Sequence, residues 1–400
     1  MALIVKKFGG SSVCDAESIQ RVAWIIAETY SEGNNVVVVL SAPGNTTDEL
    51  IEKAMEINPH PSKREMDVLL STGEQMSVAL MAMALEKLGL PAVSLTGWQI
   101  GMNTDSEYGK ARIKGVSAER LKAELDRRRI VLVAGFQGVN KFDDITTIGR
   151  GGSDTTAIAI AAELGADLCQ IYTDVEGIYT ADPRYVAEAK KLDEITYDEM
   201  IELASLGAQV LHNRSVEMAK RYRVKMEVLS SLVRKPGTKV KEVTNVEHIK
   251  VSSVAKDTDI ARIAVVEVRD EPGVAFKMFR VLANEKINVD IILQSINRNN
   301  TNDISFTVAK NDMKRAVEIL EENRDEIGFA KLEVTDDIAK VSVVGAGMMS
   351  APGVAALTFE ALYDAKINIG MISTSEIKIS VLVDSGDADR AVTAIHNKFF

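Results

Sequence analysis

The second part of the chain contains the same pattern twice, and this internal repeat limits the folds that it can adopt. In each copy an apolar strand leads through Pro-Gly-Val-Ala into a helical pattern, at residues 272–275 and 352–355. Ile-Asn-Val or Ile-Asn-Ile then begins a second strand, at residue 287 or 367. Further strands and a second helix, over residues 314–323 and 388–397, complete each copy. The repeat therefore predicts two βαββαβ modules.

The part before residue 230 has a different pattern, in which short hydrophobic strands alternate with helices. Runs rich in apolar and β-branched residues occupy residues 2–8, 36–40, 92–95, 130–134 and 168–172. Helical spacing between them includes a helix capped by Asp15 and a long stretch over residues 62–88. This alternation predicts an α/β domain with a mainly parallel sheet between helices, ending near Lys-Pro-Gly-Thr at residues 235–238.

The charge and cysteine content argue against several classes of protein. The formal net charge is −11 and the Lys and Arg residues are spread along the chain, so nucleic acid and anionic membranes are not expected partners. The two cysteines cannot form a disulfide framework, and we expect both in the core. No segment approaches the roughly 20 apolar residues of a membrane span, and the apolar start is too short for a signal peptide. We expect a cytoplasmic protein.

A glycine turn follows the first strand, at the sheet edge where α/β proteins place ligands. Gly9, Gly10 and Ser11 would let the backbone approach a ligand closely and offer N–H groups to phosphate oxygens. Lys7 precedes them and can act as a point charge on a phosphoryl group. The sequence is not a P-loop, which requires Gly-Lys-Ser/Thr. Taken alone, a tight corner explains this turn equally well.

A second glycine turn surrounds Arg150. Gly151 and Gly152 follow the arginine, and we expect Ser153 or Asp154 to open the helix that continues through residues 157–164. A helix N-terminus attracts anions, and a guanidinium fork can bind a carboxylate through two hydrogen bonds. The alternative is that Asp154 is a plain cap and Arg150 a surface charge.

Two further features are weaker when taken alone. Glu74 follows Gly73 inside the long helical pattern, where a glycine costs roughly 1 kcal/mol relative to alanine. We interpret Glu74 as directed at an ammonium group, although a solvated glutamate on a helix face remains open. Thr173 and Asp174 end a strand ahead of a polar turn at residues 180–184, and such loops commonly hold nucleotides. The four histidines have neither metal nor triad spacing, and no protein metal ligand is predicted.

Together and in this order, these motifs resemble those of the aspartate kinases. Residues 7–13 are similar to the opening signature of that family, residues 149–154 to its substrate motif, and residues 173–175 with 182–184 to its nucleotide motif. The repeat resembles the paired ACT domains of single-function members, with a specific match at residues 371–376. The resemblance implies an amino-acid-kinase fold over residues 1–243, a first ACT domain over 263–335, and a second built from 247–262 plus 336–400.

The implied reaction transfers the γ-phosphate of ATP to the β-carboxylate of L-aspartate, giving 4-phospho-L-aspartate at the start of lysine, threonine and methionine biosynthesis. Lys7 would stabilise the phosphoryl group and Asp154 would orient the reactants, while Arg150 and Glu74 would hold the α-carboxylate and ammonium of aspartate. Further substrate residues implied are Ser41, Thr47, Gly151, Gly152 and Ser153. Further nucleotide residues implied are Gly9, Gly10, Ser11, Thr173, Asp174, Tyr179, Asp182, Pro183 and Arg184. Mg²⁺ would be carried with ATP.

The resemblance also implies feedback regulation through the ACT pair, by lysine, by threonine or by both, in a homodimer or higher oligomer. The loop before the first ACT helix offers N–H groups to an effector carboxylate. We expect Asn288 and Asp290 to share one face of the next strand. The implied effector residues are Asp270, Gly273, Val274, Ala275, Asn288, Asp290, Gln294, Asn368 and Ile369.

Two other functions remain open from the sequence. A kinase for glutamate or N-acetylglutamate could share the fold, but an acylated substrate would leave Glu74 without an ammonium, and the ACT repeat would be unexplained. A non-catalytic amino-acid sensor would be expected to lose Lys7, Arg150 or Asp154, and all three are present.

Overall fold

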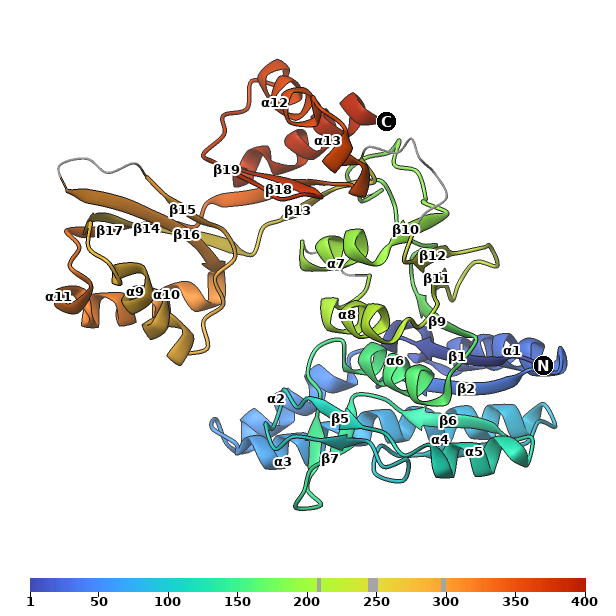
Figure 1. Cartoon of the computed structure of the whole chain (residues 1–400). Helices are drawn as coiled ribbons and strands as arrows, with labels where there is room; N and C mark the ends of the chain where they lie inside the picture. The colour runs from blue at the N-terminus through green and yellow to red at the C-terminus, as the bar shows by residue number, and fades with distance from the viewer. Residues whose placement is uncertain (207–209, 244–250, 296–299) are drawn as a thin grey trace. The chain divides into compact units, whose positions relative to one another are not determined.

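The computed structural model describes residues 1–206, 210–243, 251–295 and 300–400. Two compact units make up the chain (Figure 1). The first contains Met1–Tyr179 and Lys190–Glu247, and the second contains Thr180–Ala189 and His248–Phe400.

An eight-stranded sheet, in the order β10-β12-β11-β9-β1-β2-β6-β3, forms the centre of the first unit. Neighbouring strands from β11 to β3 run parallel, whereas β12 runs antiparallel to β11, so the prediction of a mainly parallel sheet is confirmed. The strands are β1 (Leu3–Phe8), β2 (Asn35–Leu40), β3 (Ala92–Leu95), β6 (Ile130–Ala134), β9 (Leu168–Thr173), β10 (Glu194–Thr196), β11 (Met226–Ser230) and β12 (Thr238–Lys241).

A smaller sheet, in the order β5-β4-β7-β8, lies in the same unit. Its strands are β4 (Asn103–Thr104), β5 (Ile113–Gly115), β7 (Gln137–Val139) and β8 (Ile145–Thr147). β8 leads directly into the turn that carries Arg150. This sheet therefore supports the second glycine turn.

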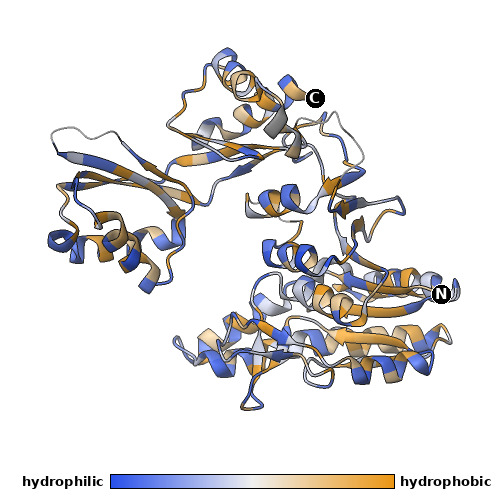
Figure 2. Ribbon diagram, in the orientation of Figure 1, coloured by the Kyte–Doolittle hydropathy of each residue, from blue (hydrophilic) through white to orange (hydrophobic). Residues whose placement is uncertain are grey.

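Helices cover both faces of the large sheet. α1 (Ala16–Ser31) and α4 (Thr72–Lys87) pack on one face, where they share a core with Phe8 and Leu132, and Asp15 caps α1 as predicted. α6 (Gly152–Leu164) packs against β1, β2 and β9 on the other face, and Figure 2 shows the strongly hydrophobic central strands. The remaining helices are α2 (Thr46–Ile57), α3 (Lys63–Leu70), α5 (Ala118–Asp126), α7 (Tyr197–Ser205) and α8 (Asn213–Tyr222).

The long helical pattern predicted over residues 62–88 is divided into α3 and α4 at Ser71. Within the described ranges, Lys63–Lys87 is one stretch that is long and apolar enough to span a membrane, judged by length and composition alone. We did not expect such a stretch from the sequence. Val78, Met81 and Leu85 of this stretch are buried in the core beside the large sheet. These three residues belong to the core, whereas Met76, Leu80 and Met83 of the same stretch are exposed.

The second unit contains the two predicted βαββαβ modules. In the first module the sheet order is β15-β16-β14-β17, and all its pairs are antiparallel. Its elements are β14 (Ile260–Arg269), α9 (Val274–Asn284), β15 (Ile292–Gln294), β16 (Thr301–Ala309), α10 (Lys310–Glu322), α11 (Arg324–Ile327) and β17 (Lys331–Thr335).

In the second module the sheet order is β13-β18-β20-β19. Its elements are β13 (Ser253–Asp257), β18 (Ile338–Val344), α12 (Val354–Asp364), β19 (Met371–Thr374), β20 (Lys378–Asp384) and α13 (Ala388–Phe399). β13 pairs antiparallel with β18, as β17 does with β14 in the first module. A strand that precedes the first module in sequence therefore completes the second, as the resemblance implied.

The strands predicted to begin at residues 287 and 367 begin later, at Ile292 and Met371. In both copies a lysine with positive φ, Lys286 (60°) or Lys366 (57°), ends the preceding helix. The next N–H then returns to the helix, from Ile287 to the carbonyl of Leu282 in the first copy. This helix-ending turn takes Ile287 out of the predicted strand. Residues 288–291 lie outside β15, so the regular strand expected to place Asn288 and Asp290 on one face is not formed.

Candidate functional site

Lys7 and Asp154 form an ion pair at the carboxyl end of β1. Their Nζ and Oδ1 atoms are 2.7 Å apart, and the two side chains are only 13% and 9% exposed. Side chains alternate along a strand, so Lys7 faces α6 while Phe8 faces the core beneath α1 and α4. The structure thus brings together a lysine and an aspartate that are far apart in sequence.

The helix that carries Asp154 begins earlier than predicted. Gly151 is the N-cap of α6 with φ 68°, and Gly152 is its first residue, so neither Ser153 nor Asp154 opens the helix. A Cβ at Gly151 would lie 2.2 Å from the Cβ of His212, and its left-handed backbone also favours glycine. No side chain caps α6, and the N–H of Gly152 donates to the carbonyl of Gly149 at 2.9 Å, so the N–H groups of Ser153 and Asp154 are the ones suited to an anionic ligand.

The Gly9–Gly10 turn is packed against the loop of residues 41–47. A Cβ at Gly10 would lie 2.7 Å from the carbonyl oxygen of Ala42, and one at Gly9 would lie 3.5 Å from Nζ of Lys7. The N–H of Gly44 donates to the carbonyl of Gly10 at 3.0 Å. Glycine at position 10 therefore allows the close approach of these two loops.

The same turn is joined to β9 through a serine that sequence reasoning missed. The hydroxyl of Ser12 donates to the hydroxyl of Ser231 at 2.8 Å, and the N–H of Ser231 donates to the carbonyl of Thr173 at 2.9 Å. No motif marks Ser231, because its partners lie far away in the sequence.

Glu74 is a buried carboxylate, only 3% exposed, so the alternative of a solvated helix face does not apply. Its Oε1 accepts the N–H of Ala42 at 3.2 Å, and no described residue makes a hydrogen bond to its buried Oε2. Burial raises the pKa of Glu74 to about 8. Gly73 sits where a Cβ would lie 2.7 Å from the Cβ of Ala42, which explains the glycine in α4. An unsatisfied buried oxygen is suited to a cationic partner.

The other predicted substrate residues border this region. Ser41 donates its N–H to the carbonyl of Phe8 at 3.2 Å, and its own carbonyl accepts the hydroxyl of Ser77 at 2.7 Å. Thr47 lies in the first turn of α2. Arg150 is exposed in the turn between β8 and α6.

The predicted nucleotide residues divide between the two units. Thr173 and Asp174 end β9 beside β1, and the Thr173 hydroxyl donates to Asp174 Oδ1 at 2.9 Å. Tyr179 closes this part of the first unit and forms a bridge with Lys191.

Asp182, Pro183 and Arg184 belong to the second unit. There Arg184 donates to both carboxylate oxygens of Asp182, at 3.0 and 2.6 Å.

The predicted effector residues lie in the two modules of the second unit. Gly273 is the N-cap of α9 with φ 95°, and the side chain of Asn302 donates to Asp270 Oδ1 at 3.0 Å. Val274 is buried and Ile369 partly buried, whereas the exposed members are Ala275, Asn288, Asp290, Gln294 and Asn368.

Asp290 already has an intramolecular cation. Its Oδ2 lies 2.5 Å from Nζ of Lys340, and that nitrogen lies 3.4 Å from Oδ2 of Asp257. The Lys340 side chain is only 5% exposed on β18. An effector ammonium would therefore compete with Lys340 for Asp290.

Within the described ranges, no three His, Cys, Asp or Glu side chains gather as a metal site. Cys169 is buried as expected, but Cys14 is exposed, so the expectation that both cysteines are core residues was wrong for Cys14.

Comparison with known proteins covers both units. The model of the amino acid kinase family matches residues 2–230, and that of an ACT domain matches residues 263–323 and 341–399. An aspartokinase of Mycolicibacterium smegmatis is 52% identical over 405 residues, which cover 100% of this chain and 96% of the relative.

Solved structures give the same result. E. coli aspartokinase III in complex with aspartate and ADP has a TM-score of 0.83 at 28% identity, with 100% of both chains covered. The same protein in complex with lysine and aspartate has a TM-score of 0.77 at 27% identity, covering 100% of this chain and 99% of the other.

Proposed function

Because this chain belongs to the aspartokinases and is an aspartate kinase, we propose that ATP and aspartate meet at the carboxyl end of β1. The enzyme transfers the γ-phosphoryl group of ATP to the β-carboxylate of L-aspartate. The likeness to aspartokinases over the full length carries this conclusion, and the two ACT domains imply allosteric regulation.

Lys7 stabilises the negative charge of the transferring phosphoryl group, and Asp154 holds its ammonium in place. Their ion pair of 2.7 Å supports this proposal. Phosphoryl transfer depends mainly on positioning and charge neutralisation. The β-carboxylate of aspartate is already ionised near neutral pH, so it attacks without a general base.

In this proposal the enzyme binds both the α-carboxylate and the α-ammonium group of aspartate. Arg150 binds the α-carboxylate beside the first N–H groups of α6, and the buried, unsatisfied Oε2 of Glu74 supports its assignment to the ammonium. The surrounding substrate residues are Ser41, Thr47, Gly151, Gly152 and Ser153.

ATP is bound by the backbone of the first glycine turn and by the end of β9. The proposed nucleotide residues are Lys7, Gly9, Gly10, Ser11, Thr173, Asp174, Tyr179, Asp182, Pro183 and Arg184. Mg²⁺ carried with ATP would neutralise phosphate charge. We expect phosphate oxygens and water to hold it.

For regulation we propose lysine as an effector, because a lysine complex of E. coli aspartokinase III resembles this chain. Threonine, alone or with lysine, is the second proposal. The domains extend over residues 1–243, 263–335, and 247–262 plus 336–400. The ACT domains also join copies into a homodimer or higher oligomer, and the enzyme is cytoplasmic.

An ATP-consumption assay with aspartate, glutamate and N-acetylglutamate in parallel tests the substrate. We expect ADP formation with aspartate alone. Faster turnover of either glutamate compound would contradict the assignment, and no turnover with any of them would favour a non-catalytic sensor.

A further inference from the structure

Asp67 of α3 carries a carboxylate that is only 1% exposed. It accepts three hydrogen bonds from two segments beside the Arg150 turn, the end of β8 and the loop that contains Gly109. The N–H groups of Thr147 and Gly109 each donate to Oδ2 at 2.9 Å, and the Thr147 hydroxyl donates to Oδ1 at 2.7 Å. Burial raises the pKa of Asp67, and these hydrogen bonds oppose the shift. A buried carboxylate is costly unless it is hydrogen-bonded, and these bonds join α3 to the end of β8.

Arg214 reaches the same two segments from α8. Its Nη1 donates to the carbonyl of Ile148 at 2.9 Å, and its Nη2 donates to the carbonyl of Ala111 at 3.2 Å. The planar guanidinium can bridge two carbonyls in a way that a lysine cannot. Between the two charged groups, the N–H of Ala111 donates to the carbonyl of Thr147 at 2.9 Å.

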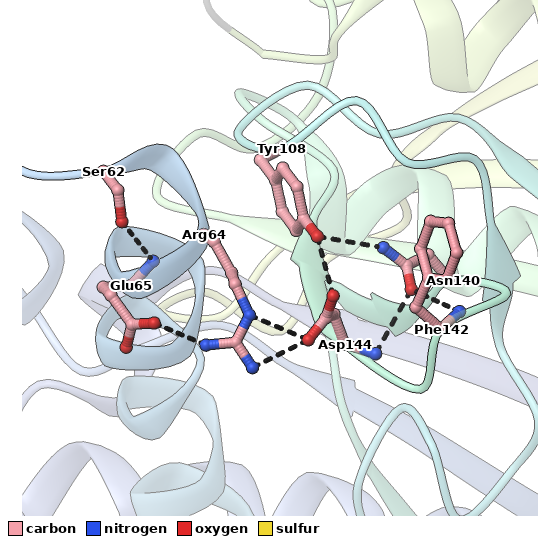
Figure 3. A network of polar contacts seen from close by, with 7 residues as sticks. All are labelled: Ser62, Arg64, Glu65, Tyr108, Asn140, Phe142 and Asp144. Atoms are coloured by element: carbon pink, nitrogen blue, oxygen red, sulfur yellow. Dashed lines mark hydrogen bonds and ion pairs between the residues drawn. The ribbon is translucent and has the colours of Figure 1, made fainter.

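A third contact ties these segments together nearer the surface (Figure 3). Arg64 of α3 lies 2.7 Å from Oδ1 of Asp144, and the Tyr108 hydroxyl donates to Oδ2 at 2.8 Å. Tyr108 precedes Gly109, and Asp144 precedes β8. Arg64 is 49% exposed, so this ion pair should contribute less than the buried bonds.

We propose that Asp67 and Arg214 are positioning residues that place Arg150 and thereby set the affinity for aspartate. This inference rests on the proposed role of Arg150. Gly149 (φ 84°) separates Ile148 from Arg150, and a Cβ on it would lie 3.1 Å from the carbonyl oxygen of Gly109. A shift of either segment is therefore passed to the turn, whereas none of these hydrogen bonds reaches the Gly9–Gly10 turn.

The test compares the KM for aspartate with the KM for ATP in full-length variants. Asp67→Asn and Arg214→Lys should each raise the aspartate KM by about 10–100-fold, the range expected when a buried hydrogen-bond partner is lost. The ATP KM should stay within about twofold of the wild-type value, since these hydrogen bonds hold only the turn proposed to bind aspartate. Arg64→Ala is the control, and it should change the aspartate KM by less than about threefold.

Thr147 provides a matched pair that does not depend on removing a charged group. Thr147→Ser keeps the hydroxyl on Asp67 and should stay near wild type, whereas Thr147→Val loses it and should raise the aspartate KM. If Asp67→Asn fails to fold, this pair decides. A fall in thermal stability with both KM values unchanged would overturn the proposal, as would equal rises in both.

Arg150→Lys separates this inference from the role on which it rests. It keeps the charge but loses the fork, and it should raise the aspartate KM well before the ATP KM. If it does not, the proposed role of Arg150 fails. If it does and the Asp67 and Arg214 variants leave the aspartate KM unchanged, the positioning role alone fails.

Discussion

Glu74 is a carboxyl group whose protonation should be linked to aspartate binding. Its pKa in the folded protein is raised to about 8 by burial, so the neutral form is favoured at pH 7. The resulting contribution to stability is present below the ordinary pKa of 4.5 and is lost as the pH rises through about 8. An ammonium group bound at Oε2 would favour the carboxylate instead.

We therefore predict that aspartate binding at pH 7 releases close to one proton, and that the aspartate KM falls between pH 6 and pH 8. Calorimetric titration in two buffers of different ionisation enthalpy measures the proton directly. Glu74→Gln should abolish the release and weaken aspartate binding. Wild-type enzyme that releases no proton would contradict the ammonium role.

Two adjacent lysines in β1 allow a test of the proposed role of Lys7, which is to stabilise the transferring phosphoryl group. Lys7 faces Asp154, whereas Lys6 is buried on the other face, with Nζ donating to Gln170 at 2.7 Å and to the Tyr172 hydroxyl at 3.0 Å. Lys7→Ala should lower kcat by about 100-fold or more, because a preorganised charge is lost. Lys6→Met should leave kcat within about threefold while lowering the thermal midpoint. Equal losses of kcat would refute the distinction.

At the scale of single residues, the sequence predicted site residues that belong to local motifs. It missed residues whose hydrogen bonds join segments far apart in the sequence. Lys7, Arg150 and Asp154 each lie within two residues of a glycine, and glycine turns can be recognised in a sequence. Asp67 and Arg214 bond mainly to backbone atoms of distant segments, which leave no residue-type signal. The pairing of Lys7 with Asp154 also depends on how the strand and the helix pack.

Among the elements, α4 shows why a glycine can be required in the first turn of a helix. Alanine is favoured over glycine by about 1 kcal/mol in a helix interior. At Gly73, however, a Cβ would lie 2.7 Å from the Cβ of Ala42, whose N–H binds Glu74. Packing against the loop of residues 41–47 therefore outweighs helix propensity.

Gly73→Ala should lower the thermal midpoint and raise the aspartate KM, because α4 must move away from Ala42. The matched control is Gly115→Ala in β5, where nothing lies within 4 Å of the added Cβ. Thermal unfolding and aspartate saturation curves check both variants. A Gly73→Ala enzyme as stable and as active as the Gly115→Ala enzyme would show that the contact relaxes freely.

Element boundaries were less predictable than element types. Apolar periodicity placed strands at residues 287 and 367, but a helix-ending turn with a left-handed lysine occupies the start of each run. A single left-handed residue costs roughly 1–2 kcal/mol, and the sequence carries no glycine there to signal it. The same turn in both copies indicates that the repeat preserves backbone geometry as well as sequence.

At the scale of the whole molecule, the internal repeat predicted both modules. Each module needs apolar residues on the buried faces of its strands and helices, and the sequence repeats that apolar pattern. The chain path was less evident from residues alone: β13 pairs with β18 although the whole first module separates them in sequence. Segment Thr180–Ala189 likewise joins the second unit, with Ala181 and Val186 in the core of the second module. Such long-range pairings follow from tertiary packing, which a local pattern does not encode.

Regulation is where the paired modules should act together. Lys340 of the second module is held by Asp290 of the first at 2.5 Å, and Asp257 lies 3.4 Å from the same nitrogen. An effector ammonium at Asp290 would share the carboxylate with this internal cation or replace it there. Asp257 would remain as a partner for Lys340. Asp290→Ala should therefore remove the effector contact without leaving Lys340 unpaired.

We predict that Asp290→Ala and Gln294→Ala relieve feedback inhibition while the uninhibited kcat and both KM values stay nearly unchanged. Activity at saturating substrates is measured against increasing lysine, threonine and both together, with thermal unfolding as a check on the fold. Asp389→Ala is the matched control, since it removes the partner of Lys256 at an exposed position of the second module. That variant should remain inhibitable. If the Asp290 and Gln294 variants are inhibited as strongly as the control, the effector binds elsewhere.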